Sequence, residues 1–480
     1  MTNAVNDVEL PPVPIRRGIA RVWAHTLTQN AVVALSCFMC PGMFNALSGI
    51  GGGGQVDPTA ANNGATALYS CFAVTSFFSG VILDRLGGRL TLSLGAAGYA
   101  LYIGSFLSYN INANGNFVVA AGAILGVCAG LLWTAQGTLT LAYATEAAKG
   151  KYIACVWIIF NLGATIGNAT MLGLTYDSSA NTVSNAVYAA FLAIASCGVI
   201  VPWLLVNPAK MVRTDGTRVI IPQQTSWKES TVGLFHFLRT HLWIVLLFPF
   251  FLASNWFYTW QFNSFNGVLF TLRTRSLNSM LYWMSQMVAA LLFGIAIDTK
   301  RIRRVTRAWS GLIFLLVLSM AVWGASYHYQ TSYTRADMAE PRAPEFARID
   351  FKDSGYAGRL ILFLFCGAMD AIWQNYAYWL MGALSNDAQK LGHLVGAYKA
   401  IQSAGAAGVY RLDTNLAPFM LELGVSWGLC AGSLLFVMPI IWFHVKDKTK
   451  DEPVVMASDD VVVHGEKAGS NSASSFEEKV

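Results

Sequence analysis

The chain has 480 residues, of which 55% are hydrophobic and only 12% are charged. An ordinary soluble domain carries roughly 25% charged residues. A chain with half that share cannot cover a water-facing surface, so we expect its main solvent to be lipid.

Twelve apolar segments follow one another along the sequence, each close to the roughly 20 residues that a membrane helix needs. A polar tail, 1–28, precedes them, and a Ser-rich tail, 445–480, follows and is expected to be disordered. The segments form an N-terminal six-helix half, 29–206, and a C-terminal half, 241–444, with a linker at 207–240. The predicted spans are 29–50, 64–83, 89–109, 117–143, 151–174, 186–206, 241–262, 277–297, 307–327, 358–384, 391–411 and 424–444.

The orientation of these spans follows from the basic residues, because Lys and Arg stay on the cytoplasmic side of short loops. With both termini inside, most of the 32 Lys and Arg residues fall on the cytoplasmic side. We therefore expect a multi-pass protein with a cytoplasmic linker and cytoplasmic tails, in either the plasma membrane or an endomembrane. The same bias explains the net charge of +6 without a nucleic-acid partner.

A repeat links the two halves. The pattern G-x-x-x-D followed by basic residues occurs at the inner ends of spans two and eight, and this placement is typical of parallel repeats in transporters. The alternative is an ordinary charged turn at each place. The residues of the two copies are Gly80, Asp84, Arg85 and Arg89 in the first, and Gly294 and Asp298 in the second.

Polar side chains inside a bilayer are costly, so they usually face a cavity or a partner. Spans three, six, nine and twelve are mostly apolar, whereas spans four, seven and ten carry amides, aromatic residues and a midspan acid. Amides beside aromatic rings can bind a small organic molecule. For each residue alone, ordinary hydrogen bonding between helices is the competing interpretation. The cavity-lining candidates are Asn45, Gln136, Asn255, Gln261, Asp370 and Gln374.

Asp370 is the strongest of these candidates. It lies about 18 Å into its predicted span at 1.5 Å per residue, and Gln374 and Tyr378 share its helix face. A carboxylate at that depth suits proton coupling or cation binding. The alternative is a static pair with a basic residue, and Lys399 in span eleven is the candidate partner.

The first copy of the repeat resembles the loop motif of the major facilitator superfamily, G-x-x-x-D-R-x-G-R-R. It departs from that motif only at Gly87-Gly88-Arg89, where a double basic pair is expected. The resemblance implies an all-α membrane fold in which helices one, four, seven and ten line the central cavity. It also implies that Asp84, Arg85 and Arg89 are gating residues.

Several further stretches resemble the Unc-93-like family, particularly its fungal branch, within that superfamily. The resemblance covers nearly the whole chain except both tails. It implies either alternating-access transport or the accessory role assigned to animal members, which modulate a channel or escort receptors. The stretches are Cys40-Pro-Gly-Met-Phe-Asn45, Trp133-Thr-Ala-Gln136, Trp157-Ile-Ile-Phe-Asn161, Gln261-Phe-Asn263, Arg273-Thr-Arg275-Ser-Leu-Asn278, Asp370-Ala-Ile-Trp373-Gln374 and Gly396-Ala-Tyr-Lys399.

These observations favour a secondary transporter of a small organic solute or ion, with Asp370 as a proton-coupling group and Lys399 modulating it. The alternative is a non-transporting accessory protein with a membrane-protein partner. An enzyme is not expected, because the sequence has no Ser/His/Asp arrangement, no H-E-x-x-H and no nucleotide loop. We expect no cofactor and no metal, since the C-x-x-C pair Cys37 and Cys40 lacks a second ligand pair.

Overall fold

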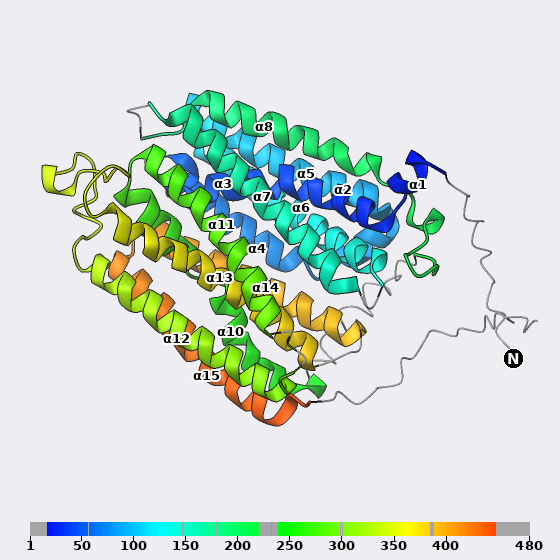
Figure 1. Cartoon of the computed structure of the whole chain (residues 1–480). Helices are drawn as coiled ribbons and strands as arrows, with labels where there is room; N and C mark the ends of the chain where they lie inside the picture. Colours follow the sequence, from blue (N-terminus) through cyan, green and yellow to red (C-terminus); the bar gives the residue numbers. More distant parts are fainter. Residues whose placement is uncertain are drawn as a thin grey trace, which may run out of the picture.

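The computed structural model describes residues 17–447 except 56, 146–147, 178–180, 220–231, 233–238, 298, 300 and 385–387. The chain forms two side-by-side helical bundles, blue to teal for the first half and green to orange for the second (Figure 1). The helices of the first half are α1 (Ile19–Trp23), α2 (Thr26–Met39), α3 (Pro41–Gly49), α4 (Thr59–Thr75), α5 (Ser79–Asn112), α6 (Gly115–Tyr143), α7 (Lys149–Thr175) and α8 (Asn185–Ile200). Those of the second half are α10 (Phe248–Ala253), α11 (Leu272–Ile297), α12 (Arg304–Gln330), α13 (Tyr356–Leu384), α14 (Ala388–Thr414) and α15 (Phe419–His444).

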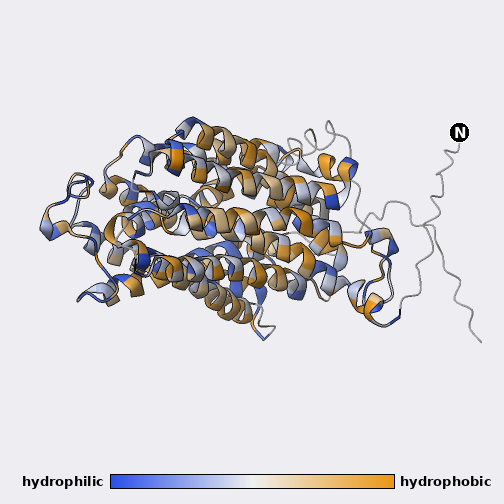
Figure 2. Ribbon diagram, turned by 90° about the horizontal axis from the view of Figure 1, so that it is seen from above, coloured by the Kyte–Doolittle hydropathy of each residue, from blue (hydrophilic) through white to orange (hydrophobic). Residues whose placement is uncertain are grey.

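The described helices make twelve crossings of the bundle, and the predicted all-α fold in two six-helix halves is confirmed. Nine of the described segments are long and apolar enough to span a membrane by themselves. The other three crossings are short (α4), broken (residues 242–267) or rich in polar residues (α14). Apolar residues follow the middle of the helices and hydrophilic ones gather at the ends (Figure 2), so the chain is a multi-pass membrane protein.

Two predicted spans are not continuous helices, and a proline lies at one discontinuity in each. The first crossing divides into α2 and α3 at Cys40, directly before Pro41. The seventh begins as a 3-10 segment at Leu242–Leu247, continues as α10 with Pro249 in its first turn, and ends as a π-helix at Thr259–Gly267. Proline has no backbone N–H and fixes its own φ, so a continuous helix through it is costly.

The second crossing is held against the fourth by glycines on α6. Three of them lie four residues apart and face α4. Gly122 lies against the backbone of Gly64, Gly126 lies against the backbone of Leu68, and Gly130 lies against the side chain of Thr75. A side chain at Gly122 or Gly126 would collide with a carbonyl oxygen of α4. Small residues at four-residue spacing thus allow the close approach of α4 and α6.

The contacts between the halves define two ends of the bundle. We call the distal end the one that carries residues 50–58, 268–271, 331–355 and 415–418, and the proximal end the one that carries residues 17 and 447. The predicted tails lie almost wholly outside the described residues: of 1–28, only 17–28 are described, and of 445–480, only 445–447. Within the predicted linker, residues 207–219 are described and form a small hairpin with a bridge between Val212 and Arg218.

Candidate functional site

Asp370 lies midway along α13 with only 1% of its surface exposed. Its Oδ2 accepts hydrogen bonds from Tyr258 Oη at 3.0 Å, Tyr282 Oη at 3.1 Å and Gln286 Nε2 at 2.7 Å, and its Oδ1 accepts from Gln374 Nε2 at 3.4 Å. All four donors are neutral, and no described Lys, Arg or His forms an ion pair with it. The carboxylate is thus solvated by side chains from three crossings and paired with no cation.

Lys399 does not pair directly with Asp370. Its Nζ donates to Gln402 Oε1 at 2.9 Å. Gln402 Nε2 then donates to Gln374 Oε1 at 3.1 Å, and Gln374 Nε2 donates to the Asp370 carboxylate. The amides of Gln402 and Gln374 therefore connect the cation to the anion. Every N–H in this chain of hydrogen bonds points from Lys399 toward Asp370. Among the described residues, Lys399 and Asp370 are thus joined by this chain and form no direct ion pair.

The broken seventh crossing supplies the rest of the polar site. Ser254 and Asn255 follow α10, where the helix is interrupted. The Ser254 carbonyl accepts from Gln374 Nε2 at 3.3 Å, and Asn255 Oδ1 accepts from Gln374 at 3.1 Å and from Gln402 at 3.0 Å. Carbonyls freed by a helix break must be satisfied by side chains or water inside a membrane. Broken helices near the midplane commonly form transporter binding sites.

Of the seven predicted substrate or coupling residues, the structure brings five into one connected network: Asn255, Gln261, Asp370, Gln374 and Lys399. Gln261 joins it because its Oε1 lies 2.9 Å from the Tyr282 hydroxyl, whose single proton it shares with Asp370.

The remaining two residues lie in the other half. Asn45 is half-buried on α3, and Gln136, also half-buried, donates to Thr140 Oγ1 at 3.1 Å within α6. Neither has a hydrogen bond to the Asp370 network.

The predicted gating loop lies at the proximal end. Gly80 is buried near the start of α5, Asp84 and Arg85 are exposed, and Gly87 breaks the helix with a φ of 73°. Arg89 Nε donates to the Leu205 carbonyl at 2.9 Å, and its Nη2 contacts the same oxygen. This contact joins the third and sixth crossings within one half.

In the second copy of the repeat, Gly294 lies half-buried in the last turn of α11, and Asp298 lies outside the described residues.

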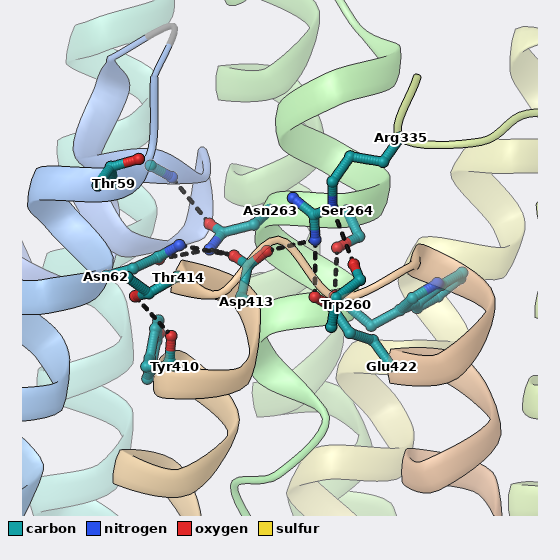
Figure 3. A network of polar contacts seen from close by, with 12 residues as sticks. Thr59, Asn62, Trp260, Asn263, Ser264, Arg335, Tyr410, Asp413, Thr414 and Glu422 are labelled. Carbon is teal, nitrogen blue, oxygen red and sulfur yellow. Dashed lines mark hydrogen bonds and ion pairs between the residues drawn. The ribbon is translucent and has the colours of Figure 1, made fainter. Parts of the chain in front are cut away.

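A second buried polar network closes the distal end (Figure 3). Asp413 Oδ2 accepts from Asn62 Nδ2 at 2.7 Å and from Asn263 Nδ2 at 2.8 Å. Arg335 Nη2 contacts Asp413 Oδ1 at 2.6 Å and Glu422 Oε1 at 2.8 Å. Both carboxylates are almost completely buried, at 1% and 0% exposed. Because Asn62 belongs to the first half and the others to the second, the network ties the halves together.

Further distal hydrogen bonds cross between the halves. Arg275 Nε donates to the Ile50 carbonyl at 2.6 Å, and its Nη2 donates to the Gly51 carbonyl at 2.8 Å. Gly52 N donates to Asn263 Oδ1 at 2.8 Å, and Asn266 Nδ2 donates to the Gly49 carbonyl at 2.8 Å. The chain between the first two crossings is thus clamped against the seventh and eighth.

A cavity of about 30 Å³ lies just inside the distal network. Asn62, Asn263, Tyr102 and Tyr410 contribute to its walls. That volume holds water but no organic solute. This cavity is therefore too small to hold an organic solute beside the distal network.

Some residues of both networks were not predicted. Tyr282 and Gln286 of α11 follow Asn278 at four-residue spacing, and this polar stripe on one helix face was the available signal. Arg335, Asp413 and Glu422 gave no signal, since their contacts span 78 and 87 positions in the chain.

Comparisons with known proteins agree with this architecture. A family model described as Major Facilitator Superfamily matches residues 27–410. The chain is 44% identical over 428 residues to an UNC93-like protein of Schizosaccharomyces pombe, covering 89% of this chain and 84% of the relative. It is 40% identical over 430 residues to UNC93-like protein 1 of Arabidopsis thaliana, covering 89% and 92%.

Solved transporter structures share the fold. The proton:xylose symporter XylE from E. coli aligns with a TM-score of 0.59 at 14% identity, over 89% of this chain and 98% of that one. The nucleoside transporter NupG aligns with a TM-score of 0.57 at 10% identity, over 88% and 100%. At these identities the likeness concerns the fold alone.

Proposed function

The chain belongs to the Major Facilitator Superfamily and, within it, to the UNC93-like proteins, and from this membership we propose that it is a secondary transporter working by alternating access. Its cargo is a small organic solute or ion, and Asp370 is the proton-coupling group. The family assignment supplies the transporter-like architecture, and the midspan network supports the finer proposal.

The observation that carries the proposal is the environment of Asp370. A carboxylate deep in a membrane is expensive unless it is paired or functional. Asp370 has no described cationic partner, and four neutral side chains hold it instead. Neutral donors stabilise the ionised form but do not forbid the protonated one, since no direct ion pair has to be broken when the proton binds. Such a site can take up and release a proton during transport.

The closed distal end supports a cycle with two access states. With the predicted orientation, the distal end faces outside, and the clamp around Asp413 shuts that side. Alternating access then requires this clamp to break when the proximal side closes. The accessory alternative needs no such cycle.

The test uses purified protein in proteoliposomes with an imposed pH gradient and a pH-sensitive dye inside. We expect solute-dependent proton flux from a panel of small solutes, and we expect Asp370→Asn to abolish it while the protein remains folded. Asp215→Asn, which changes an exposed linker carboxylate, is the matched control and should transport normally. Unchanged flux in Asp370→Asn would remove Asp370 from the mechanism. No flux with any solute, together with recovery of a stoichiometric membrane partner, would favour the accessory role.

A further inference from the structure

Lys399 presents an incompletely bonded ammonium group in the middle of the bundle. It lies about midway along α14 and is half-buried. An ammonium has three N–H donors, and the described residues give Nζ one acceptor, Gln402 Oε1. The rings of Tyr378 and Tyr398 flank Nζ, with centroids at 5.6 Å and 5.1 Å. Donors therefore remain for a further partner.

The titratable groups around Asp370 and Lys399 carry no charge at physiological pH. The titratable groups that face Asp370 or Lys399 are phenols and one thiol, which are neutral at physiological pH. These groups are Tyr69 on α4, Tyr258 on the seventh crossing, Tyr282 on α11, Cys366 and Tyr378 on α13, and Tyr398 on α14. Among the described residues, Asp370 and Lys399 are thus the charged groups of the midspan network.

The two-amide chain couples these charges. While Asp370 is ionised, each amide of Gln374 and Gln402 points its N–H toward the carboxylate and its oxygen toward the cation. This order stabilises both charges at once. When Asp370 binds a proton, the network loses its anion, and the cation in the membrane interior is no longer compensated. A charge in that position calls for a counter-ion.

We propose that the substrate is a small organic anion, which binds Lys399 when Asp370 is protonated and moves together with that proton. This inference rests on the proposed transport function and assigns its substrate class. One bound anion replaces the charge that one proton removes, so a monovalent anion and a proton move without net charge. The ammonium binds the acid group, and the rings of Tyr378 and Tyr398 pack against the organic part.

The main test compares three solutes that share a skeleton and differ in charge: 4-hydroxyphenylacetate, its primary amide, and the corresponding amine, tyramine. Proteoliposomes with an inward proton gradient should accumulate the carboxylate and should accumulate neither the amide nor the amine. Clamping the membrane potential with potassium and valinomycin should leave the rate unchanged, because the movement is electroneutral.

Lys399→Gln should reduce carboxylate uptake roughly a hundredfold, the loss expected when one partner of a desolvated charge pair is removed. Lys399→Arg keeps the charge and should retain part of the uptake. Lys352→Gln is the matched control, since Lys352 also lies over two aromatic rings, at 5.9 Å and 5.8 Å, but in an exposed loop. Size-exclusion profiles and melting temperatures establish that each variant is folded.

The outcomes separate the two proposals. Uptake of the amide or amine without the carboxylate overturns the anion assignment and leaves the transporter proposal in place. Carboxylate uptake that is intact in Lys399→Gln also overturns the role of Lys399. No movement of any solute by folded protein contradicts both proposals.

A second measurement needs no substrate. Infrared difference spectra of the protonated Asp370 carboxyl, assigned by its loss in Asp370→Asn, follow its titration. The midpoint should move to higher pH in Lys399→Gln, because a cation that favours the carboxylate is gone. Gln402→Leu should shift it in the same direction by a smaller amount, since it interrupts the chain. Equal midpoints in all three proteins would overturn the coupling between the two residues.

Discussion

The two buried polar networks stabilise buried carboxylates in opposite ways. The midspan network holds one carboxylate, Asp370, with four neutral donors and keeps its cation two amides away. The distal network holds two carboxylates, Asp413 and Glu422, in direct contact with one guanidinium at 2.6 Å and 2.8 Å. A carboxylate held by neutral groups can change protonation without breaking a direct ion pair. A carboxylate in direct ionic contact cannot, so the distal network suits a structural clamp and the midspan network suits a proton carrier.

Arg335→Gln tests the ionic half of this comparison and should have the largest effect. Removing one partner of a buried ion pair costs about 3–5 kcal/mol, because uncompensated charge is left behind. We expect a large drop in the melting temperature of the purified protein. A loss below about 1 kcal/mol, a value typical of exposed pairs, would show that the distal network is not an ionic clamp.

The double variant Arg335→Gln with Glu422→Gln sharpens the same point. It leaves Asp413 held by the neutral amides of Asn62 and Asn263, which copies the chemistry of the midspan site. Much of the lost stability should return, although the single variant Glu422→Gln need not be stabilising. A double variant no more stable than Arg335→Gln alone would show that uncompensated carboxylate charge does not cause the loss of stability.

Asn62→Ala breaks the clamp between the halves without touching an ionic contact. It removes a 2.7 Å hydrogen bond to a carboxylate, and such bonds contribute about 1.5–3 kcal/mol. The distal end should then open more often, as measured by distances between spin labels on the exposed distal residues 112 and 352. Asn63→Ala is the control on the same helix, since Asn63 has only a 3.4 Å contact with Arg411. Equal distance distributions in both variants would contradict a clamping role for Asn62.

Gln286→Leu tests the neutral half of the comparison. Gln286 supplies the shortest of the four hydrogen bonds to Asp370, at 2.7 Å. Losing one donor should weaken the ionised state by about 1–2 kcal/mol, with three donors remaining. Because the protonated form of Asp370 is then favoured, the fall in transport toward high pH should move to higher pH, measured as initial rates in proteoliposomes from pH 5 to pH 8. A pH profile identical to that of the unmodified protein would show that these donors do not control the proton.

The smallest effect is expected from Asp350→Asn in the distal loop. Burial tends to raise the pKa of Asp350, but hydrogen bonds from Arg273 and Thr271 outweigh it and hold the pKa below its usual value. The stability that ionised Asp350 contributes to the folded protein is therefore fully present above the unfolded-state pKa. It disappears as the pH falls through the lowered folded-state pKa. The partly exposed ion pair should contribute about 1 kcal/mol at neutral pH. The difference in melting temperature between variant and parent should vanish in acid, and a difference that persists there would contradict this origin.

The sequence predicted the architecture well because hydrophobic length and charge bias act locally along the chain. It placed Asp370, Gln374, Asn255, Gln261 and Lys399 as candidates because polar residues in apolar spans are conspicuous. The partners that these side chains contact in the fold could not be predicted in this way. The link from Lys399 to Asp370 depends on how Gln402 and Gln374 meet across two helices. The contact of Arg335 with Glu422 depends on a loop folding back onto the bundle.

The breaks in the first and seventh crossings were visible in part as prolines, but the sequence alone did not show that the seventh ends as a π-helix. The orientation of the termini and the domain boundaries remain predictions. Asn45 and Gln136 also remain predicted lining residues, because the described conformation gives them no contact with the midspan network.

The glycine contacts of α6 determine which surfaces can move past one another. They bring the backbones of α4 and α6 into close contact. On its other side, α4 packs against α14, and there the rings of Tyr69 and Tyr410 stack with centroids 5.7 Å apart and planes 11° from parallel. Parallel rings can shift sideways without losing contact. In the proposed transport cycle, a change of access state would then shear the halves along this aromatic boundary, and a bulkier residue there should slow the cycle without entering the solute path.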